Sequence, residues 1–174
     1  AVSAWAGSTR RAVLWFSLGP EDSSLASLVP LLFYGLSRRF PGDPGSPVPE
    51  DPGFGAEGPA EQAPRYLAAL LARQVKERLP DREIVLVLDD YHLCDGEAVN
   101  TFILELSNQS TSRIKFVIIG RTDPGLPVSR LRAQNRIDEI RTPDLRFAPD
   151  DLAAFLPLHV NRPVPEELLS MIDR

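Results

Sequence analysis

Glu83-Ile-Val-Leu-Val-Leu-Asp-Asp-Tyr-His92 is the stretch from which the fold of this 174-residue chain can be deduced. Its apolar residues, from Ile84 to Leu88, follow one another without alternating with polar residues. A continuous apolar run of this length is typical of a strand buried on both faces, as in a parallel sheet. The stretch therefore predicts an inner strand of an α/β sheet.

Two adjacent carboxylates, Asp89 and Asp90, follow this strand directly. Open α/β sheets bind their ligands at the carboxyl ends of their strands, so acidic residues there have a candidate function. In phosphate-handling proteins, an acid at this point holds Mg²⁺, directly or through water, and a neighbouring acid orients the attacking water. The first hypothesis is a nucleotide-binding strand. The alternative is an ordinary buried strand followed by an acidic loop.

The composition is typical of a soluble globular protein, with 43% hydrophobic and 25% charged residues. A net charge of −5 argues against nucleic-acid binding through the overall field of this chain, although another domain of a longer protein could bind DNA. The single cysteine, Cys94, and two histidines allow neither an internal disulfide nor a zinc site with the usual spacing. No signal peptide or membrane span is evident, so we expect a cytoplasmic protein.

The rest of the chain alternates between strands and helices. Nearly uniform apolar runs predict further strands over 12–18 and 113–121, and a short fourth strand over 137–141. Helical periodicity predicts helices over 25–40, 65–79, 97–106, 129–134 and 151–158, another from 164, and the end of a helix over 1–7. Ser23 or Ser24 is expected to cap the 25–40 helix, and Pro30 to kink it or mark a restart. The pattern favours an α/β class with a mostly parallel sheet.

Residues 41–64 differ in kind from their surroundings. They hold seven of the 17 prolines and five of the 11 glycines, with few aliphatic residues. Such a segment cannot form a packed core, and it is interpreted as a loop inserted into the domain. A domain boundary is the alternative, but each flanking piece is small for independent folding.

A third polar residue, Arg121, ends the predicted strand 113–121. In a parallel sheet this residue would lie at the same edge as Asp89 and Asp90. A metal ion with a polyphosphate needs both charges, carboxylates for the cation and a guanidinium for phosphate oxygens. The alternative is a structural salt bridge from Arg121 to Asp89, Asp90 or Asp123.

Four segments in this order resemble one family. Leu-Asp-Asp-Tyr-His-Leu resembles the Walker B segment of the large ATP-binding transcriptional regulators of the MalT/LuxR type, which belong to the STAND class of signal-transduction ATPases. Residues 116–133 are similar to the family's strand with its sensor arginine and the following loop. The similarity continues over 137–152, and 12–18 resembles the strand that follows the phosphate-loop helix. The matching segments are 12–18, 88–93, 116–133 and 137–152.

The resemblance implies a P-loop NTPase-like, three-layer α/β/α fold that binds ATP and Mg²⁺. Asp89 would coordinate the metal, Asp90 would polarise the attacking water, and Arg121 would sense the γ-phosphate. Asp90 and Arg121 would then be the catalytic residues, and all three would bind the cofactor. His92 belongs to the motif but is expected to hydrogen-bond a neighbouring loop rather than act as a base.

The chain departs from the family pattern in one respect: it has no Gly-x-x-x-x-Gly-Lys-Ser/Thr phosphate loop. We interpret residues 1–174 as a partial STAND-type domain that lacks the phosphate-loop strand; a degenerate member that has lost the loop is the alternative. Without that strand the neighbouring strands would present unpaired backbone groups and apolar faces, so we expect the isolated segment to be poorly stable. It is also expected to be inactive alone.

The function implied is that of an ATP-binding switch. Slow ATP hydrolysis would control self-association in the full-length protein and DNA binding by a domain outside this chain. The alternative is a non-catalytic scaffold of the same family that binds protein partners without nucleotide. A phosphotransferase with Asp89 as nucleophile is disfavoured, because Lys76 and Lys115 are badly placed for a receiver-type site.

Overall fold

The computed structural model describes residues 2–41, 63–109, 113–146, 151 and 155. The chain divides into two compact units, Ala1–Val128 and Ser129–Arg174. The first unit contains all the strands of the described residues, and the second contains most of the short helix α5 (Val128–Ala133).

The first unit is built on a three-stranded sheet with the order β1-β2-β3. Its strands are β1 (Ala12–Ser17), β2 (Ile84–Asp89) and β3 (Ile114–Ile118), and both pairings are parallel. In the register, Leu86 lies between Leu14 and Phe116, and Ser17 pairs with Asp89. The predicted inner strand is confirmed, since the apolar residues of β2 are at most 2% exposed.

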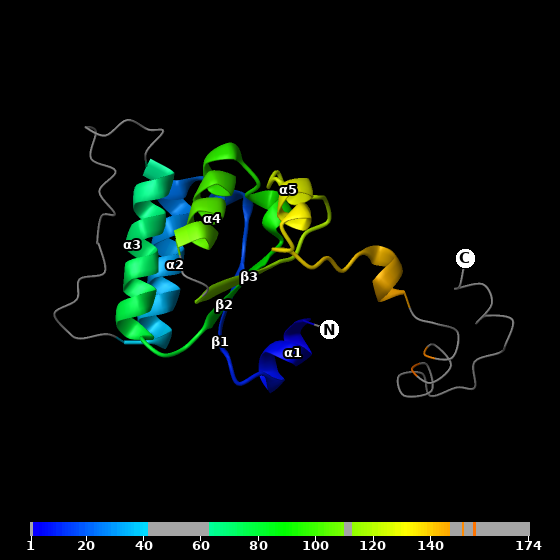
Figure 1. Cartoon of the computed structure of the whole chain (residues 1–174), viewed down its shortest axis with the longest axis horizontal. Coiled ribbons are helices and arrows are strands. Elements are labelled where there is room, and N and C mark those ends of the chain that lie inside the picture. The colour runs from blue at the N-terminus through cyan, green and yellow to red at the C-terminus, as the bar shows by residue number, and fades with distance from the viewer. Residues whose placement is uncertain (1, 42–62, 110–112, 147–150, 152–154, 156–174) are drawn as a thin grey trace, which may run out of the picture. The chain divides into compact units, whose positions relative to one another are not determined.

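Helices flank the sheet. Figure 1 shows α2 (Leu25–Arg39), α3 (Ala63–Arg78) and α4 (Glu97–Gln109) on one side of it and α1 (Val2–Ser8) on the other. Leu14, Phe16 and alternate residues of β2 form one apolar core with the inner faces of α2, α3 and α4. Gly35 of α2 is needed for this packing, because a Cβ there would lie 2.6 Å from the Phe16 ring. The predicted α/β class is therefore confirmed, and the arrangement is consistent with a P-loop-like α/β/α fold.

The strands on either side of β2 are less buried than β2 itself. Trp15 of β1 is 38% exposed, Lys115 of β3 is exposed, and Val117 and Ile118 are only partly buried. Within the described residues, β3 pairs on one side only. A phosphate-loop strand, which the sequence analysis expects outside these 174 residues, would pair with β3 on this open side. That such a strand exists stays a prediction.

The predicted start of α2 is confirmed, and of the two effects predicted for Pro30 in that helix, a restart is wrong and a kink stays a prediction. Ser24 caps α2, since its side chain accepts a hydrogen bond from the Ser27 N–H. Pro30 does not mark a restart, because α2 is continuous through it. α3 begins at Ala63, two residues before the expected start, and 42–62 of the proposed insertion lie outside the described residues. No helix within the described ranges is long and apolar enough to cross a bilayer.

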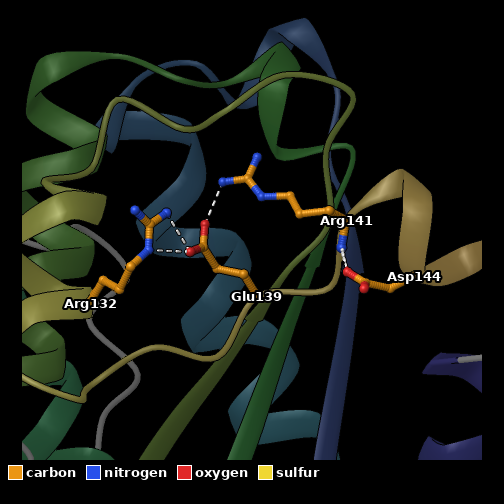
Figure 2. Close-up of polar contacts among 4 residues, drawn as sticks. All are labelled: Arg132, Glu139, Arg141 and Asp144. Atoms are coloured by element: carbon orange, nitrogen blue, oxygen red, sulfur yellow. Dashed lines mark hydrogen bonds and ion pairs between the residues drawn. The ribbon is translucent and has the colours of Figure 1, made fainter.

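The second unit corrects the prediction of a fourth strand. Residues 137–141 have no regular secondary structure, because side-chain ion pairs rather than a neighbouring strand hold them. Figure 2 shows the Glu139 carboxylate between the guanidinium groups of Arg132 and Arg141, while the Arg141 N–H donates to the Asp144 carboxylate at 2.7 Å. The helices expected over 151–158 and from 164 lie outside the described residues, apart from Asp151 and Phe155.

Candidate functional site

Asp89 is the last residue of β2 and lies at the carboxyl end of the central strand. Its C=O accepts a hydrogen bond from the Leu18 N–H at 2.9 Å, which holds the chain after β1 against the end of β2. Its side chain is partly buried, and Oδ1 accepts the Asp90 N–H at 3.1 Å. The backbone at Asp89 is therefore fixed by neighbours, as a metal-binding position requires.

Asp90 turns the chain sharply out of the sheet. It has φ 57° and ψ 33°, in the left-handed region that few residues other than glycine adopt. The short 3₁₀ helix Tyr91–Leu93 follows, and the Leu93 N–H donates to the Asp90 C=O at 2.9 Å. Such backbone conformations cost of order 1–3 kcal/mol and cluster at functional sites. The turn leaves the Asp90 side chain 49% exposed at the sheet edge.

The end of β3 lies directly beside this turn. The Ile119 N–H donates to the Leu88 C=O at 2.9 Å, and the Ile119 C=O accepts the Tyr91 N–H at 2.9 Å. Arg121, two residues further, is exposed. The topology thus brings the backbone positions of Asp89, Asp90 and Arg121 to one edge of the sheet, as the sequence analysis expected.

The side chains at this edge are not paired with each other. Within the described part of the chain, Arg121 makes no ion pair with Asp89 or Asp90. Of the salt bridges in the alternative hypothesis, those from Arg121 to Asp89 and Asp90 do not form among the described residues, and the one to Asp123 stays a prediction. Arg121 is exposed, the Asp90 side chain is 49% exposed and Asp89 is partly buried.

His92 does not hydrogen-bond the neighbouring loop, contrary to the prediction. Its Nδ1 is buried without a hydrogen-bond partner, and the nearest carboxylate oxygen, Asp90 Oδ1, is 3.9 Å away. The contact with the loop is van der Waals packing: a Cβ at Gly120 would lie 3.6 Å from the His92 N and 3.7 Å from its Cβ. These are ordinary van der Waals distances, so the loop after β3 lies against the turn at His92.

A polar network beside the site was not anticipated from the sequence. The Tyr91 hydroxyl donates to Asn100 Oδ1 at 2.7 Å, and Asn100 Nδ2 donates to Asp95 Oδ1 at 2.6 Å. Both oxygens of Asp95 accept the Gly125 N–H, at 3.1 and 3.0 Å. Tyr91 is 1% exposed, and burial raises the pKa of its hydroxyl far above the usual value, so it remains a donor.

A depression of about 450 Å³ adjoins this network rather than the sheet edge. It is shallow and open, and it does not include the predicted site residues. The sheet edge is the better candidate, because ligands of open parallel sheets bind there. The lining of the depression includes Asp95, Glu97, Asn100, Thr101, Gly125 and Pro127.

The carboxylates of the sheet edge suit Mg²⁺ only together with phosphate. Among the described residues, no group of three or more His, Cys, Asp or Glu side chains could hold a metal ion. Mg²⁺ in nucleotide sites, however, uses one or two carboxylates, waters and the phosphates themselves. Asp89 could supply one such carboxylate, whereas the two acids of this edge do not form a self-sufficient metal site.

Comparison with known proteins finds similarity to short segments of two kinds of much longer protein. It is 26% identical over 145 residues to serine/threonine-protein kinase PknK of Mycobacterium tuberculosis (strain H37Rv), which covers 83% of the chain and 12% of that protein. It is 24% identical over 86 residues to the HTH-type transcriptional regulator MalT of Yersinia pestis (strain Pestoides F), covering 49% of the chain and 10% of MalT. No family model matches the chain. The chain thus spans about a tenth of the length of the curated relatives it matches, and its likeness to MalT-type regulators is weak.

Proposed function

We propose that this chain is part of the ATP-binding switch module of a MalT/LuxR-type transcriptional regulator. The observation that carries the proposal is the sheet edge, where Asp89 and Asp90 at the end of β2 meet the chain that leads from β3 to the exposed Arg121. The similarity to a segment of a transcriptional regulator and of a protein kinase supports a regulatory role.

Each residue has a distinct role in this proposal. Asp89, whose backbone is held by pairing with β1 and by the Leu18 N–H, holds Mg²⁺, which would neutralise phosphate charge when bound. Asp90, exposed on its left-handed turn, orients the water that attacks the terminal phosphate. Arg121 donates to the γ-phosphate oxygens, since a planar guanidinium matches phosphate geometry. Hydrolysis is slow and resets the switch.

The switch controls other parts of a longer protein. The nucleotide state biases a conformational equilibrium, and self-association in the ATP state would bring DNA-binding domains outside this chain together. A ligand can shift such an equilibrium only by its difference in affinity for the two states. Arg121 supplies that difference, because it contacts a phosphate that ATP has and ADP lacks.

The test is an ATP titration of the complete gene product with and without Mg²⁺, in which calorimetry measures the binding affinity. Loss of a charge-assisted contact is expected to weaken binding about tenfold to a hundredfold. Asp89→Ala should remove most of the Mg²⁺ dependence, and Arg121→Ala should reduce ATP affinity more than ADP affinity. The matched controls are Asp81→Ala and Arg82→Ala, because both side chains are exposed at the surface before β2. If both site variants bind and hydrolyse ATP like the parent, the proposal is wrong.

A second candidate is a non-catalytic scaffold of the same family that binds protein partners without nucleotide. It is supported by one observation, that these 174 residues contain no Gly-x-x-x-x-Gly-Lys-Ser/Thr sequence. The discriminating observation is the coding sequence upstream of Ala1. A Gly-Lys-Ser/Thr there supports the switch, and its lack, together with no ATP binding, supports the scaffold.

A further inference from the structure

The loop that carries Arg121 is held at both ends by the segment that follows Asp89 and Asp90. At its first end, Ile119 exchanges backbone hydrogen bonds with the sheet and the turn: its N–H donates to the Leu88 C=O, and its C=O accepts the Tyr91 N–H, each at 2.9 Å. The loop therefore starts from a fixed point on the acidic turn.

At its second end the loop is held by a side chain, Asp95. The Gly125 N–H donates to both carboxylate oxygens of Asp95, at 3.1 and 3.0 Å. Asp95 is itself held by Asn100 Nδ2 at 2.6 Å, and Asn100 accepts the hydroxyl of the buried Tyr91 at 2.7 Å. The same residue, Tyr91, thus contributes its backbone N–H to one end of the loop and its hydroxyl to the network at the other end.

The hydrogen bonds from the Gly125 N–H to the Asp95 carboxylate are called here the Asp95–Gly125 tether. The packing around Gly125 shows that this tether needs a residue without a side chain at position 125. A Cβ at position 125 would lie 2.6 Å from Asn100 Nδ2 and 3.1 Å from Asp95 Oδ1, so alanine would push the network apart. The next residue, Leu126, packs against the apolar core and limits movement of the loop away from Asp95. The five residues between the two anchors, 120–124, include Arg121.

We propose that Asp95 is a positioning residue that couples Arg121 to the acidic turn. The inference rests on the proposed nucleotide function and deepens it: the Asp95–Gly125 tether sets the height of Arg121 above the sheet edge. When Arg121 binds a phosphate, the displacement of the loop is transmitted through the hydrogen bonds of Asp95 and Asn100 to Tyr91. It thereby reaches the turn at Asp90 and the first turn of α4.

The test is a double-mutant cycle for Mg²⁺-ATP binding on the complete gene product, with Asp95→Ala, Arg121→Ala and the double variant. Asp95→Ala is expected to weaken ATP binding about threefold to thirtyfold, the range of coupling effects for residues that do not touch the ligand. In the Arg121→Ala background, the same change should leave ATP affinity unaltered, because Asp95 acts through Arg121. A merely structural role would weaken binding equally in both backgrounds.

A second variant breaks the tether without removing the carboxylate. Gly125→Ala should weaken ATP binding like Asp95→Ala, whereas Gly7→Ala, where an added Cβ meets nothing within 4 Å, should not. Hydrogen exchange in the absence of nucleotide should show faster exchange of the Gly125 amide in Asp95→Ala than in the control Asp81→Ala. If Asp95→Ala yields too little folded protein, Asp95→Asn keeps the size of the side chain and one acceptor oxygen.

The outcomes separate the two proposals. If Arg121→Ala weakens ATP binding but Asp95→Ala and Gly125→Ala do not, the coupling inference is overturned and the nucleotide function stands. Equal loss from Asp95→Ala in both Arg121 backgrounds also overturns the inference. If neither Asp89→Ala nor Arg121→Ala affects ATP binding, the nucleotide function fails and the coupling falls with it.

Discussion

The two units of this chain are stabilised by different interactions. In the first, Ala1–Val128, a continuous apolar core holds the sheet and helices together, and the ion pair Arg11–Glu83 lies at the surface, with side chains 54% and 42% exposed. In the second, none of the described residues is buried, and Ile140 is 70% exposed. There the chain is organised by a carboxylate between two guanidinium groups (Figure 2).

The difference teaches where a precise site can be built. A buried core resists deformation, so the turn at Asp90 and the loop of Arg121 start from fixed backbone points. Exposed ion pairs contribute little and are weakened by salt and acid. We therefore expect the candidate site to keep its geometry under conditions that loosen residues 129–146.

The largest expected effect is the loss of packing in the first unit. Phe102 of α4 is 0% exposed, and Phe102→Ala should lower the free energy of unfolding by about 3–5 kcal/mol, because it leaves a cavity. Urea unfolding followed by circular dichroism measures this change. Ile140→Ala in the second unit is the matched comparison and should change stability by less than about 0.5 kcal/mol. Similar losses of unfolding free energy in Phe102→Ala and Ile140→Ala would contradict the conclusion that, among the described residues, only the first unit is stabilised by a buried core.

The next effect concerns the reactivity of Cys94, which is 1% exposed and donates to the Tyr91 C=O at 3.4 Å. Burial, with smaller contributions from Asp22 and Asp95, raises the pKa of its thiol from 9.0 to about 11. The thiolate population near neutral pH is then about a hundredfold lower, so iodoacetamide should label native Cys94 more slowly than the urea-unfolded chain by at least this factor.

A cysteine placed in the second unit sharpens this test. Ser129 is exposed, so in Ser129→Cys the added thiol should react with iodoacetamide at the rate of an unfolded peptide while Cys94 stays protected. Mass spectrometry of labelled peptides separates the two sites. Rapid labelling of Cys94 in the native protein at pH 8 would mean that the segment after the acidic turn opens readily.

A smaller effect is expected from the polar network. Tyr91→Phe removes the hydroxyl that donates to Asn100 at 2.7 Å, and it should lower the free energy of unfolding by about 1 kcal/mol. Tyr66→Phe is the control, because the Tyr66 side chain is 60% exposed. Thermal unfolding gives the stability of both variants. No difference between them would show that solvent replaces the hydrogen bond to Asn100 without loss.

The smallest effect on global stability is expected in the second unit. Hydrogen bonds from Arg141 and then Arg132 hold the pKa of Glu139 below its ordinary value of 4.5. Because the folded-state pKa is lowered, the stabilisation is present above pH 4.5 and is lost as the pH falls through the lower folded value. Hydrogen exchange over 129–141 should therefore become faster in acid.

Glu139→Gln should produce the same local loosening at neutral pH, with no measurable change in global unfolding. Asp138→Asn, a change of the exposed neighbouring carboxylate, is the control and should leave exchange unaltered. Protection of 129–141 that is the same at neutral pH and in acid would show that contacts other than the ion pairs hold this segment.

The sequence by itself determined the elements whose signals are local. The apolar run Ile84–Leu88 identified the central parallel strand, since only a strand covered on both faces tolerates five such residues in a row. Helical periodicity located α2 and α4, and Ser24 marked the start of α2. It also placed Asp89, Asp90 and Arg121 at one edge, because parallel strands end on the same side.

Only the tertiary structure decided the contacts between distant residues. The Asp95–Gly125 tether joins positions 30 residues apart, and no local pattern encodes it. Residues 137–141 have apolar positions that suit a strand, yet a strand needs a partner, and two arginines hold this segment instead. His92 packs against Gly120 while its buried Nδ1 has no hydrogen-bond partner, and no local sequence pattern indicates either contact.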